Sequence, residues 1–368
     1  MSKQTTSDYT SSINDFEEYI RQGEPEQKEK GYAWQTAIGL QAVDGLKPSS
    51  YLIETARQNI EGDITIEEVK DRIDTYYKSQ PTDKAPDRTE EADKVSARIT
   101  EILSERAFNF SPAEYISIHK RLFEGIYEFA GKIRDYNISK REWVLNEESV
   151  YYASAGSIRA TLDYDFEQER RFDYRALSML ETVGHIAAFI SDIWQIHAFG
   201  EGNTRTTAVF AIKYLRTFGF DVNNELFARH SWYFRNALVR ANYNDLKNNI
   251  HATNEYLECF FRNLLLDEDN VLRNRELLVN VAADDNSQSA KKQTMTSPKS
   301  NNCTLDCTLD EHLVLEFLKI NPRATQKEIA VHIHKSERTV KTLTSSLQQK
   351  QLLERINGKR NGYWNVKL

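Results

Sequence analysis

The sequence predicts a mainly α-helical chain divided into three modules. Seven prolines and fourteen glycines are few for 368 residues, and most segments carry apolar residues at helical spacing rather than in strict alternation. Hydrophobic residues make up 40% and aromatic residues 11% of the chain. This is ample for packed cores and argues against global disorder.

Two polar stretches separate the modules. "SQPTDKAPDRTEEAD" contains proline and few apolar residues, and "AADDNSQSAKKQTMTSPKSNNCTLDCTLD" is rich in Ser, Asn and Lys, so both are typical of linkers. The resulting boundaries are a disordered segment 1–12, a helical module 13–79, a linker 80–93, a central helical domain 94–281, a flexible linker 282–308 and a C-terminal module 309–368.

Capping residues divide the N-terminal module into short helices. Gly45 and Gly62 are each placed to end a helix at its C-cap. Thr65 precedes Glu68 by three residues, which is the spacing of a capping box and predicts a helix start there.

The central domain combines a long helix with a break in the helical pattern. Residues 173–196 predict an apolar-faced helix that leads into a glycine-containing motif. Upstream, residues 136–150 are short of helical spacing and have Asn146 at a turn. This segment predicts a β-hairpin or an extended flap.

The C-terminal module is predicted to be a winged helix-turn-helix. Helical patterns at residues 311–321, 325–334 and 336–352 precede two short strands around Asn-Gly turns. Residues 321–368 hold ten Lys/Arg against three Asp/Glu, in a chain of formal net charge −7. A basic module on an acidic body makes DNA a candidate partner, and protein interaction or dimerisation is the alternative. The DNA-contact candidates are Arg338 and Lys341 near the start of the recognition helix, with Lys359 and Arg360 at the wing tip.

Composition also limits the class of protein. The three cysteines, Cys259, Cys303 and Cys307, are too few for a disulfide scaffold and fit a reducing compartment. The polar N-terminus lacks the apolar core of a signal peptide, and no apolar run is long enough to span a membrane. We therefore expect a cytoplasmic protein without a membrane partner.

The motif "IHAFGEGNTRTTAVF" at residues 196–210 combines the residue types of a phosphate site. Gly200 and Gly202 permit close backbone approach, and Asn203 lies where a helix begins, so unpaired N–H groups face the loop. Arg205 can offer a second phosphate its forked donors. A glycine turn between two core helices is the plainer interpretation of the same residues.

Two further side chains supply what chemistry at a phosphate requires. The Glu201 carboxylate suits a hard cation such as Mg²⁺ held against phosphates. His197, at the end of the preceding helix, can act as general base toward an incoming hydroxyl. Attack of a hydroxyl on a nucleotide phosphate is the reaction that this combination predicts.

The motif resembles the Fic family signature HxFx(D/E)GNxRxxR. The preceding apolar helix, "GKIRDYNISKREWVL" upstream and "WYFRNALVRANY" downstream are similar to the same domain, so the resemblance covers about residues 95–270. It implies a Fic helical bundle with a β-hairpin flap. The matching signature residues are His197, Phe199, Glu201, Gly202, Asn203 and Arg205.

The resemblance implies a protein adenylyltransferase that uses ATP and Mg²⁺. His197 would deprotonate a Ser, Thr or Tyr hydroxyl of a target protein or of the chain itself, and AMP would be transferred to that oxygen. Glu201 would coordinate Mg²⁺ together with the ATP phosphates. Nucleotide contacts are implied for Gly200, Glu201, Gly202, Asn203, Thr204, Arg205, Phe234 and Asn242, and target contacts in the flap for Ile138, Ser139 and Lys140.

Two positions depart from the signature. Ala208 replaces the last arginine, which in the family orients the γ-phosphate, and Thr204 replaces a common glycine. The related Doc branch also lacks that arginine and phosphorylates proteins, but Doc-like sequences carry alanine at the position of Gly202. AMP transfer is therefore favoured, and a Doc-like kinase or transfer of another nucleotide is the alternative.

The N-terminal module resembles the antitoxin-type domain that inhibits Fic enzymes. The inhibitory motif (S/T)xxxE(G/N) has no clean match, and Asp44 and Glu61, each before a glycine, are the candidates for its glutamate, with Asp44 the better placed. Because Ala208 removes the arginine that this glutamate pairs with, that salt bridge is not expected. The module either inhibits sterically or supports the fold.

A non-catalytic alternative is a winged-helix DNA-binding regulator whose Fic domain senses a nucleotide. The retention of His197 and of the phosphate-facing residues as far as Arg205 favours an enzyme. A homo-oligomer is a further candidate state that the sequence leaves open.

Overall fold

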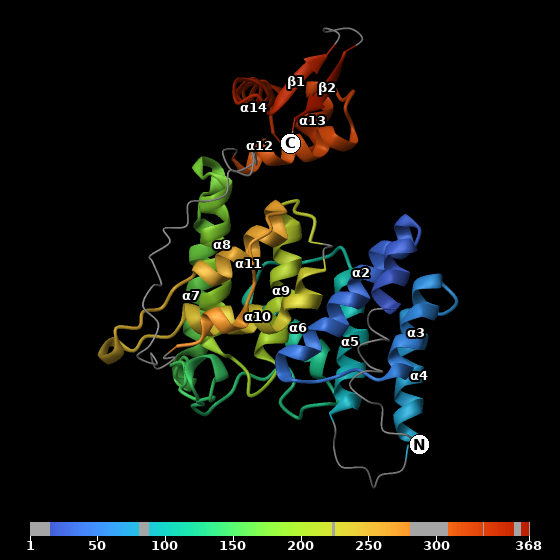
Figure 1. Cartoon of the computed structure of the whole chain (residues 1–368), viewed down its shortest axis with the longest axis vertical. Coiled ribbons are helices and arrows are strands. Elements are labelled where there is room, and N and C mark those ends of the chain that lie inside the picture. The colour runs from blue at the N-terminus through green and yellow to red at the C-terminus, as the bar shows by residue number, and fades with distance from the viewer. Residues whose placement is uncertain are drawn as a thin grey trace, which may run out of the picture.

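The computed structural model describes residues 15–80, 88–222, 225–279, 308–333, 335–356 and 362–367. Within these ranges helices predominate, and one two-stranded sheet lies near the C-terminus (Figure 1). None of the described helices is both long and apolar enough to cross a membrane.

The N-terminal helices form a small core of their own. The elements are α2 (Pro25–Gly39), η1 (Leu40–Asp44), α3 (Ser50–Glu61) and α4 (Ile66–Lys78). Trp34 is fully buried, and its indole N–H donates to Asn59 at 2.9 Å. The predicted capping box at Thr65 is confirmed, as are left-handed C-caps at Gly45 and Gly62.

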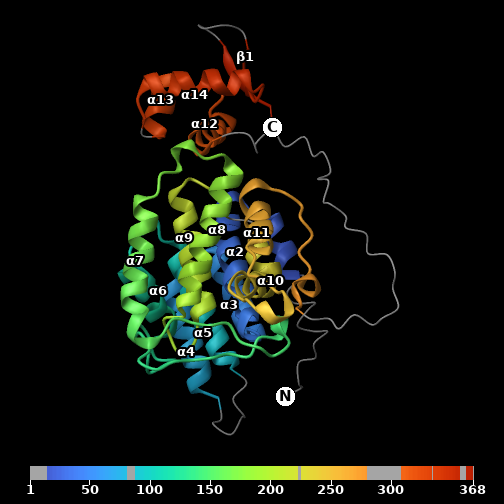
Figure 2. The same cartoon turned by 90° about the vertical axis from the view of Figure 1, so that its left-hand side faces the viewer.

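Helix α5 (Thr89–Ser104) joins these helices to the central domain. It packs against α2 and α4 on one side and α6 on the other, and Figure 1 shows it between the two groups. In the view of Figure 2 the N-terminal helices lie behind the central domain. The predicted linker was too long, because residues 89–93 already belong to α5. Glu90 and Glu91 in the first turn favour a helix start there, since carboxylates stabilise the positive N-terminal end of a helix.

The central domain is a helical bundle built around α8 and α9. Ser178 and Glu181 form a capping box that starts α8, five residues after the helix start that the sequence predicted. The helices of this domain are α6 (Pro112–Phe123), α7 (Ile158–Arg171), α8 (Met179–Ile196), α9 (Asn203–Thr217), α10 (Leu226–Ala241) and α11 (Glu255–Leu266). Short 3₁₀ turns lie at η2 (Trp143–Leu145), η3 (Ala155–Ser157), η4 (Tyr174–Ala176), η5 (Leu246–Asn248) and η6 (Asn274–Leu277).

The flap, residues 136–150, contains no β-strand in the structure, so the β-hairpin interpretation is wrong and the extended one describes it. Glu142, just before η2, has extended backbone angles, and its N–H donates to the Glu148 carbonyl at 2.9 Å. Asn146 and Glu147 both have positive φ angles, 53° and 70°. Two consecutive left-handed residues are compatible with a hairpin turn, but the 3₁₀ turn η2 directly before them takes the place of the strand that a hairpin would need.

The C-terminal unit consists of α12 (Leu309–Ile320), α13 (Gln326–His332), α14 (Glu337–Gln349), β1 (Leu353–Ile356) and β2 (Tyr363–Val366). The strands pair antiparallel, with Leu353 opposite Val366. This order of helices and strands is the one that the sequence predicts. The unit contacts the central domain through α12, where the His312 ring lies 5.6 Å from that of Phe220. Lys359, Arg360, Cys303 and Cys307 lie outside the described residues.

Candidate active site

The signature loop connects α8 to α9 through two residues in the left-handed region. His197 is the C-cap of α8 with φ 50°, and Gly202 is the N-cap of α9 with φ 77°. A Cβ atom on Gly202 would lie 2.4 Å from the Phe123 ring. Only glycine satisfies both the backbone angle and the close approach, so the loop geometry requires Gly202.

Asn203 ties the loop together with its own side chain. Its Oδ1 accepts from the Phe199 N–H at 3.0 Å, and its Nδ2 donates to the Phe199 carbonyl at 2.8 Å. The neighbouring Thr204 hydroxyl accepts from the Trp194 indole at 3.0 Å. These bonds fix the start of α9, whose first-turn N–H groups have no intrahelical partners and form an anion-binding end.

His119, which sequence reasoning missed, holds the same loop from α6. Its Nδ1 accepts from the Gly131 N–H at 2.9 Å, so its Nε2 carries the proton and donates to the Glu201 carbonyl at 3.0 Å. Its ring stacks on Phe199 with centroids 3.7 Å apart. Burial lowers the pKa of His119 to about 4. A single histidine in a helical pattern gave no signal of this role.

His197 is buried, and its imidazole is not engaged in a hydrogen bond within the described part of the chain. It is 3% exposed, and neither ring nitrogen has a hydrogen-bond partner among the described residues. The Tyr152 ring covers it with centroids 4.0 Å apart. Burial lowers the pKa of His197 well below its ordinary value, and the nearby charges of Lys140 and Arg134 act in the same direction. The imidazole is therefore neutral at physiological pH, as a general base must be.

Glu201 lies at the mouth of the site and is paired with the flap. Lys140 Nζ lies 3.2 and 3.1 Å from the two Glu201 carboxylate oxygens. Of the other predicted flap residues, Ser139 is exposed and Ile138 is half-buried. No cluster of three metal-ligating side chains occurs in the described part of the chain. A Mg²⁺ ion at Glu201 would therefore take most of its ligands from phosphate and water, which is how Mg²⁺ is commonly held.

Arg205 lies inside the protein and contacts the N-terminal helices. It is fully buried, and its Nε and Nη2 lie 2.7 Å from carboxylate oxygens of Asp44 and Glu91 respectively. Its Nη1 donates to the Gln41 amide oxygen at 3.0 Å. In this state Nη1 and Nη2 donate hydrogen bonds to Gln41 and Glu91, and Nε forms a close ion pair with Asp44, so the guanidinium that the sequence assigns to a phosphate is engaged within the protein. The Phe123 ring covers the guanidinium at 4.8 Å.

Glu91 is a second residue that sequence reasoning missed, because it fell in the predicted linker. It accepts hydrogen bonds from Arg88, Arg205 and Tyr127. Burial alone would raise the pKa of Glu91, but the hydrogen bond from Arg88 and the charge of Arg205 lower it to about 2. Glu91 is thus a permanent anion beside Arg205 at physiological pH.

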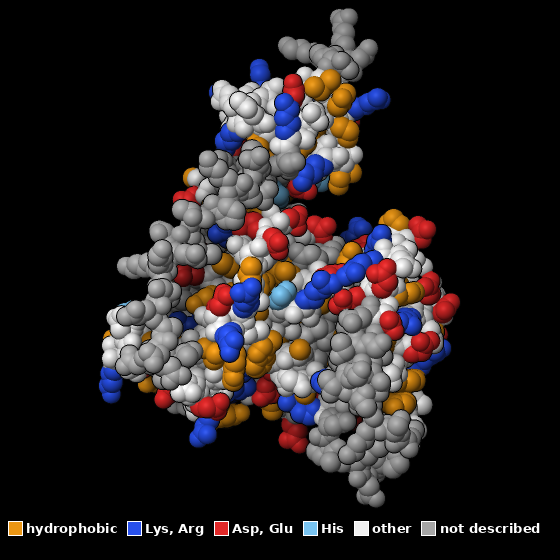
Figure 3. All heavy atoms as spheres, in the orientation of Figure 1, with side chains coloured by type: hydrophobic (Ala, Val, Ile, Leu, Met, Phe, Trp, Pro, Cys, Tyr) orange, Lys and Arg blue, Asp and Glu red, His pale blue; other side chains and the backbone are white. Residues whose placement is uncertain are grey.

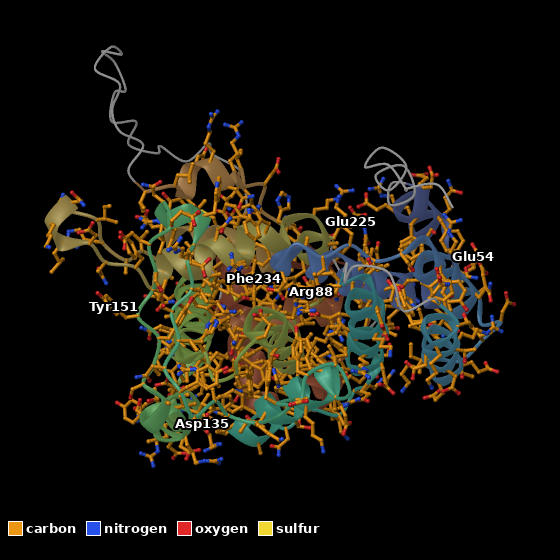
Figure 4. The ribbon with its side chains drawn as sticks, turned by 90° about the horizontal axis from the view of Figure 1, so that it is seen from below. Glu54, Arg88, Asp135, Tyr151, Glu225 and Phe234 are labelled. Atoms are coloured by element: carbon orange, nitrogen blue, oxygen red, sulfur yellow. The ribbon has the colours of Figure 1, made fainter. Side chains whose placement is uncertain are left out.

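Three predicted site residues are placed elsewhere. Glu61, at the end of α3, accepts from Tyr19 and from Gln27 on the N-terminal helices, so it is not an acid of this site. Phe234, labelled among the packed side chains in Figure 4, is fully buried against Phe227 and Phe260 and presents no face to a nucleotide. Asn242 donates to Ser191 and to the Leu238 carbonyl, which gives it a role at the end of α10.

The two described DNA-contact candidates lie on the surface. Arg338 and Lys341 are both exposed on α14. Figure 3 shows several Lys and Arg side chains on the visible face of the C-terminal unit. The candidates therefore have the accessibility that contact with a phosphate backbone requires.

Comparisons with known proteins add one finding. A search of curated proteins found no match. In a comparison with protein-family models, residues 109–215 match the Fic/DOC family, whose members are generally transferases. The matched segment contains α6, the flap, the signature loop and most of α9. This match supports membership of the Fic family for the central domain of the chain.

Proposed function

We propose that the chain is a protein adenylyltransferase that transfers AMP from ATP to a Ser, Thr or Tyr hydroxyl of a target protein or of itself. The observation that carries the proposal is the state of His197. It is a neutral imidazole with both nitrogens unpartnered, next to the anion-binding start of α9 and to the Glu201 carboxylate. A solely structural histidine in so buried a position would be expected to have a hydrogen-bond partner.

The reaction follows from these positions. A His197 ring nitrogen accepts the proton of the target hydroxyl, whose oxygen forms a bond to the α-phosphorus of ATP. The bond from the α-phosphorus to the bridging oxygen breaks, and pyrophosphate leaves. The N–H groups at the start of α9 stabilise the charge on the phosphate oxygens. Mg²⁺ at Glu201 would supply further charge neutralisation. The Glu201 carboxylate, 34% exposed, is the group of this chain that fits such an ion.

The N-terminal helices, which we interpret as an antitoxin-like module, hold the enzyme in a restrained state. The inhibitory contact differs from the one that the family signature implies, since the partner of Asp44 is Arg205 and not an arginine at position 208. Arg205 can contact a phosphate only after it leaves Asp44. The short 3₁₀ turn η1 therefore supplies the inhibition.

Two alternatives follow from specific residues. Ala208 is fully buried, so no cation stands at the position that orients the γ-phosphate, and a Doc-like kinase or the transfer of another nucleotide would use a different nucleotide pose.

The order of elements in the C-terminal unit favours a winged helix that binds DNA through α14, which would make the chain a nucleotide-sensing regulator. In that case DNA affinity would fall with salt, and less steeply in Arg338→Ala. The same proposal includes a cytoplasmic location, and it keeps the homo-oligomer as the candidate oligomeric state.

A labelling experiment separates these activities. The purified chain and the His197→Ala variant are incubated with cell lysate, Mg²⁺ and ATP labelled on either the α- or the γ-phosphate. AMP transfer predicts protein-bound label from the α-position, lost in His197→Ala. Label from the γ-position alone would indicate a kinase, and no label from either position in both wild type and Asp44→Asn, with nucleotide binding intact, would indicate a regulator.

A further inference from the structure

Lys140 is the flap residue that reaches into the candidate active site. Figure 4 labels Asp135 and Tyr151, the residues that precede and follow the flap. The Lys140 ammonium is 27% exposed and contacts both oxygens of Glu201. Its charge also lowers the pKa of His197. One side chain of the flap therefore acts on both the general base and the carboxylate of the site.

The other cations near His197 have structural partners. Arg134 is buried and donates to backbone carbonyls of His197, Tyr136 and Ala153. Arg235 pairs at 2.8 Å with Glu142, which is 1% exposed. Both would leave buried acceptors unsatisfied if they moved, which opposes their movement. Among the described residues the Lys140 ammonium pairs with Glu201, which is 34% exposed, and Lys140 lies on a segment without strand pairing.

The site also has too little positive charge for a triphosphate. Arg205 is neutralised by two carboxylates, and position 208 holds alanine instead of arginine. Two or more cations normally accompany the phosphates of a bound nucleotide. A lysine with three rotatable donors on a long stem can exchange a carboxylate for a phosphate within the reach of its own side chain.

We propose that Lys140 is a phosphate-binding residue of this enzyme. In the nucleotide-free chain it neutralises Glu201, and when a nucleotide binds it turns to the phosphates that lie against Glu201. It thereby supplies the cation that the signature loses at Ala208. This inference rests on the proposed function for the presence of a nucleotide in the site. It differs from the role that the resemblance gives the flap, where Lys140 contacts the target peptide.

Nucleotide affinity tests the proposal without reference to turnover. Dissociation constants of ATP and ADP are measured by calorimetry, in the presence of Mg²⁺, for the full chain and for Lys140→Met, Lys140→Arg and Lys132→Met. Lys132 is an exposed lysine at the base of the same segment and serves as the matched control. We expect the constants to rise about tenfold or more in Lys140→Met, because a hydrogen bond to a charged group is lost. Lys140→Arg and Lys132→Met stay within about threefold of wild type.

The outcomes distinguish this proposal from the proposed function. Unchanged or tighter ATP binding by Lys140→Met, in a variant with wild-type melting temperature, would overturn the role of Lys140 alone. Weaker binding by that variant, combined with a wild-type chain that transfers no AMP, would support Lys140 and overturn adenylyl transfer. Failure of the wild-type chain to bind either nucleotide would overturn both.

Discussion

Asp44 and Arg205 form an ion pair of 2.7 Å that joins the N-terminal helices to the signature loop. Asp44 is the last residue of η1, and the left-handed C-cap at Gly45 fixes its position. Asp44 is 13% exposed, whereas the second acid on Arg205, Glu91, is 8% exposed. Both acids are therefore largely buried beside Arg205, with Asp44 the slightly more exposed of the two.

The first prediction concerns the backbone of the loop. Gly202→Ala strains a positive φ angle and also places a Cβ 2.4 Å from the Phe123 ring. Gly125→Ala strains a similar angle, φ 73°, but meets no atom within 4 Å. Urea unfolding should therefore show that Gly202→Ala loses about 1–3 kcal/mol more stability than Gly125→Ala, which is the usual cost of overpacking. Equal losses would mean that the loop relaxes around an added methyl group.

Access to the general base is the subject of the second prediction. The Tyr152 ring covers His197, and its hydroxyl donates to Glu142 at 3.3 Å. Tyr152→Ala should uncover the imidazole and raise its rate of modification by diethylpyrocarbonate, measured by peptide mass spectrometry, about tenfold or more. Tyr152→Phe keeps the ring and should leave the rate near that of wild type.

Tyr151→Ala is the matched control for this measurement, since Tyr151 is adjacent in sequence but 87% exposed. The same increase in Tyr151→Ala and Tyr152→Ala would show that flap loosening, and not the covering ring, governs access to His197.

The third prediction concerns the dependence of stability on pH. His119 accepts a hydrogen bond at Nδ1 and is buried, so its pKa falls from 6.5 to about 4 on folding. As the pH falls, the unfolded chain binds a proton at His119 before the folded chain does. The contribution of His119 to stability is therefore fully present above pH 6.5 and is lost as the pH falls toward 4. Between neutral pH and about pH 5 the loss from His119 is about 2 kcal/mol.

Unfolding free energies of wild type and His119→Phe, compared over this pH range, check the value. His197 contributes in the same direction in both proteins, so the difference between the two slopes isolates His119. Parallel slopes would show that His119 binds its proton equally in the folded and the unfolded chain and does not hold Glu201 as described.

The sequence predicted local features well where a single rule decides them. Thr65 with Glu68 forms the expected capping box, and His197 to Arg205 lie together on one loop because they are close in sequence. Contacts between distant segments were not predictable in this way. Glu91 and His119 gave no local signal, and their roles arise only when α5 and α6 pack beside α9.

The same distinction explains the errors. Glu61 and Asp44 both precede a glycine; the sequence favoured Asp44 by its position, and the packing of η1 against α9 places it at the site. Phe234 was placed near a nucleotide by a loose resemblance, whereas its ring completes an aromatic cluster with Phe227 and Phe260. The flap was short of helical spacing and had Asn146 at a turn, which suggested strands; the turn is present, but a 3₁₀ turn at Trp143–Leu145 precedes it in place of a strand.

The central claim is that Asp44 withholds Arg205 from the nucleotide. The measurement that tests it most directly is the dissociation constant of ATP, by calorimetry with Mg²⁺, for wild type, Asp44→Asn and Glu61→Gln. Glu61→Gln changes the other acid of the N-terminal module that precedes a glycine, which lies away from the site. We predict binding about tenfold tighter for Asp44→Asn, because an amide holds a guanidinium far more weakly than a carboxylate does, and no change for Glu61→Gln. Binding by Asp44→Asn equal to or weaker than that of wild type would contradict the claim and leave Asp44 as a structural partner of Arg205.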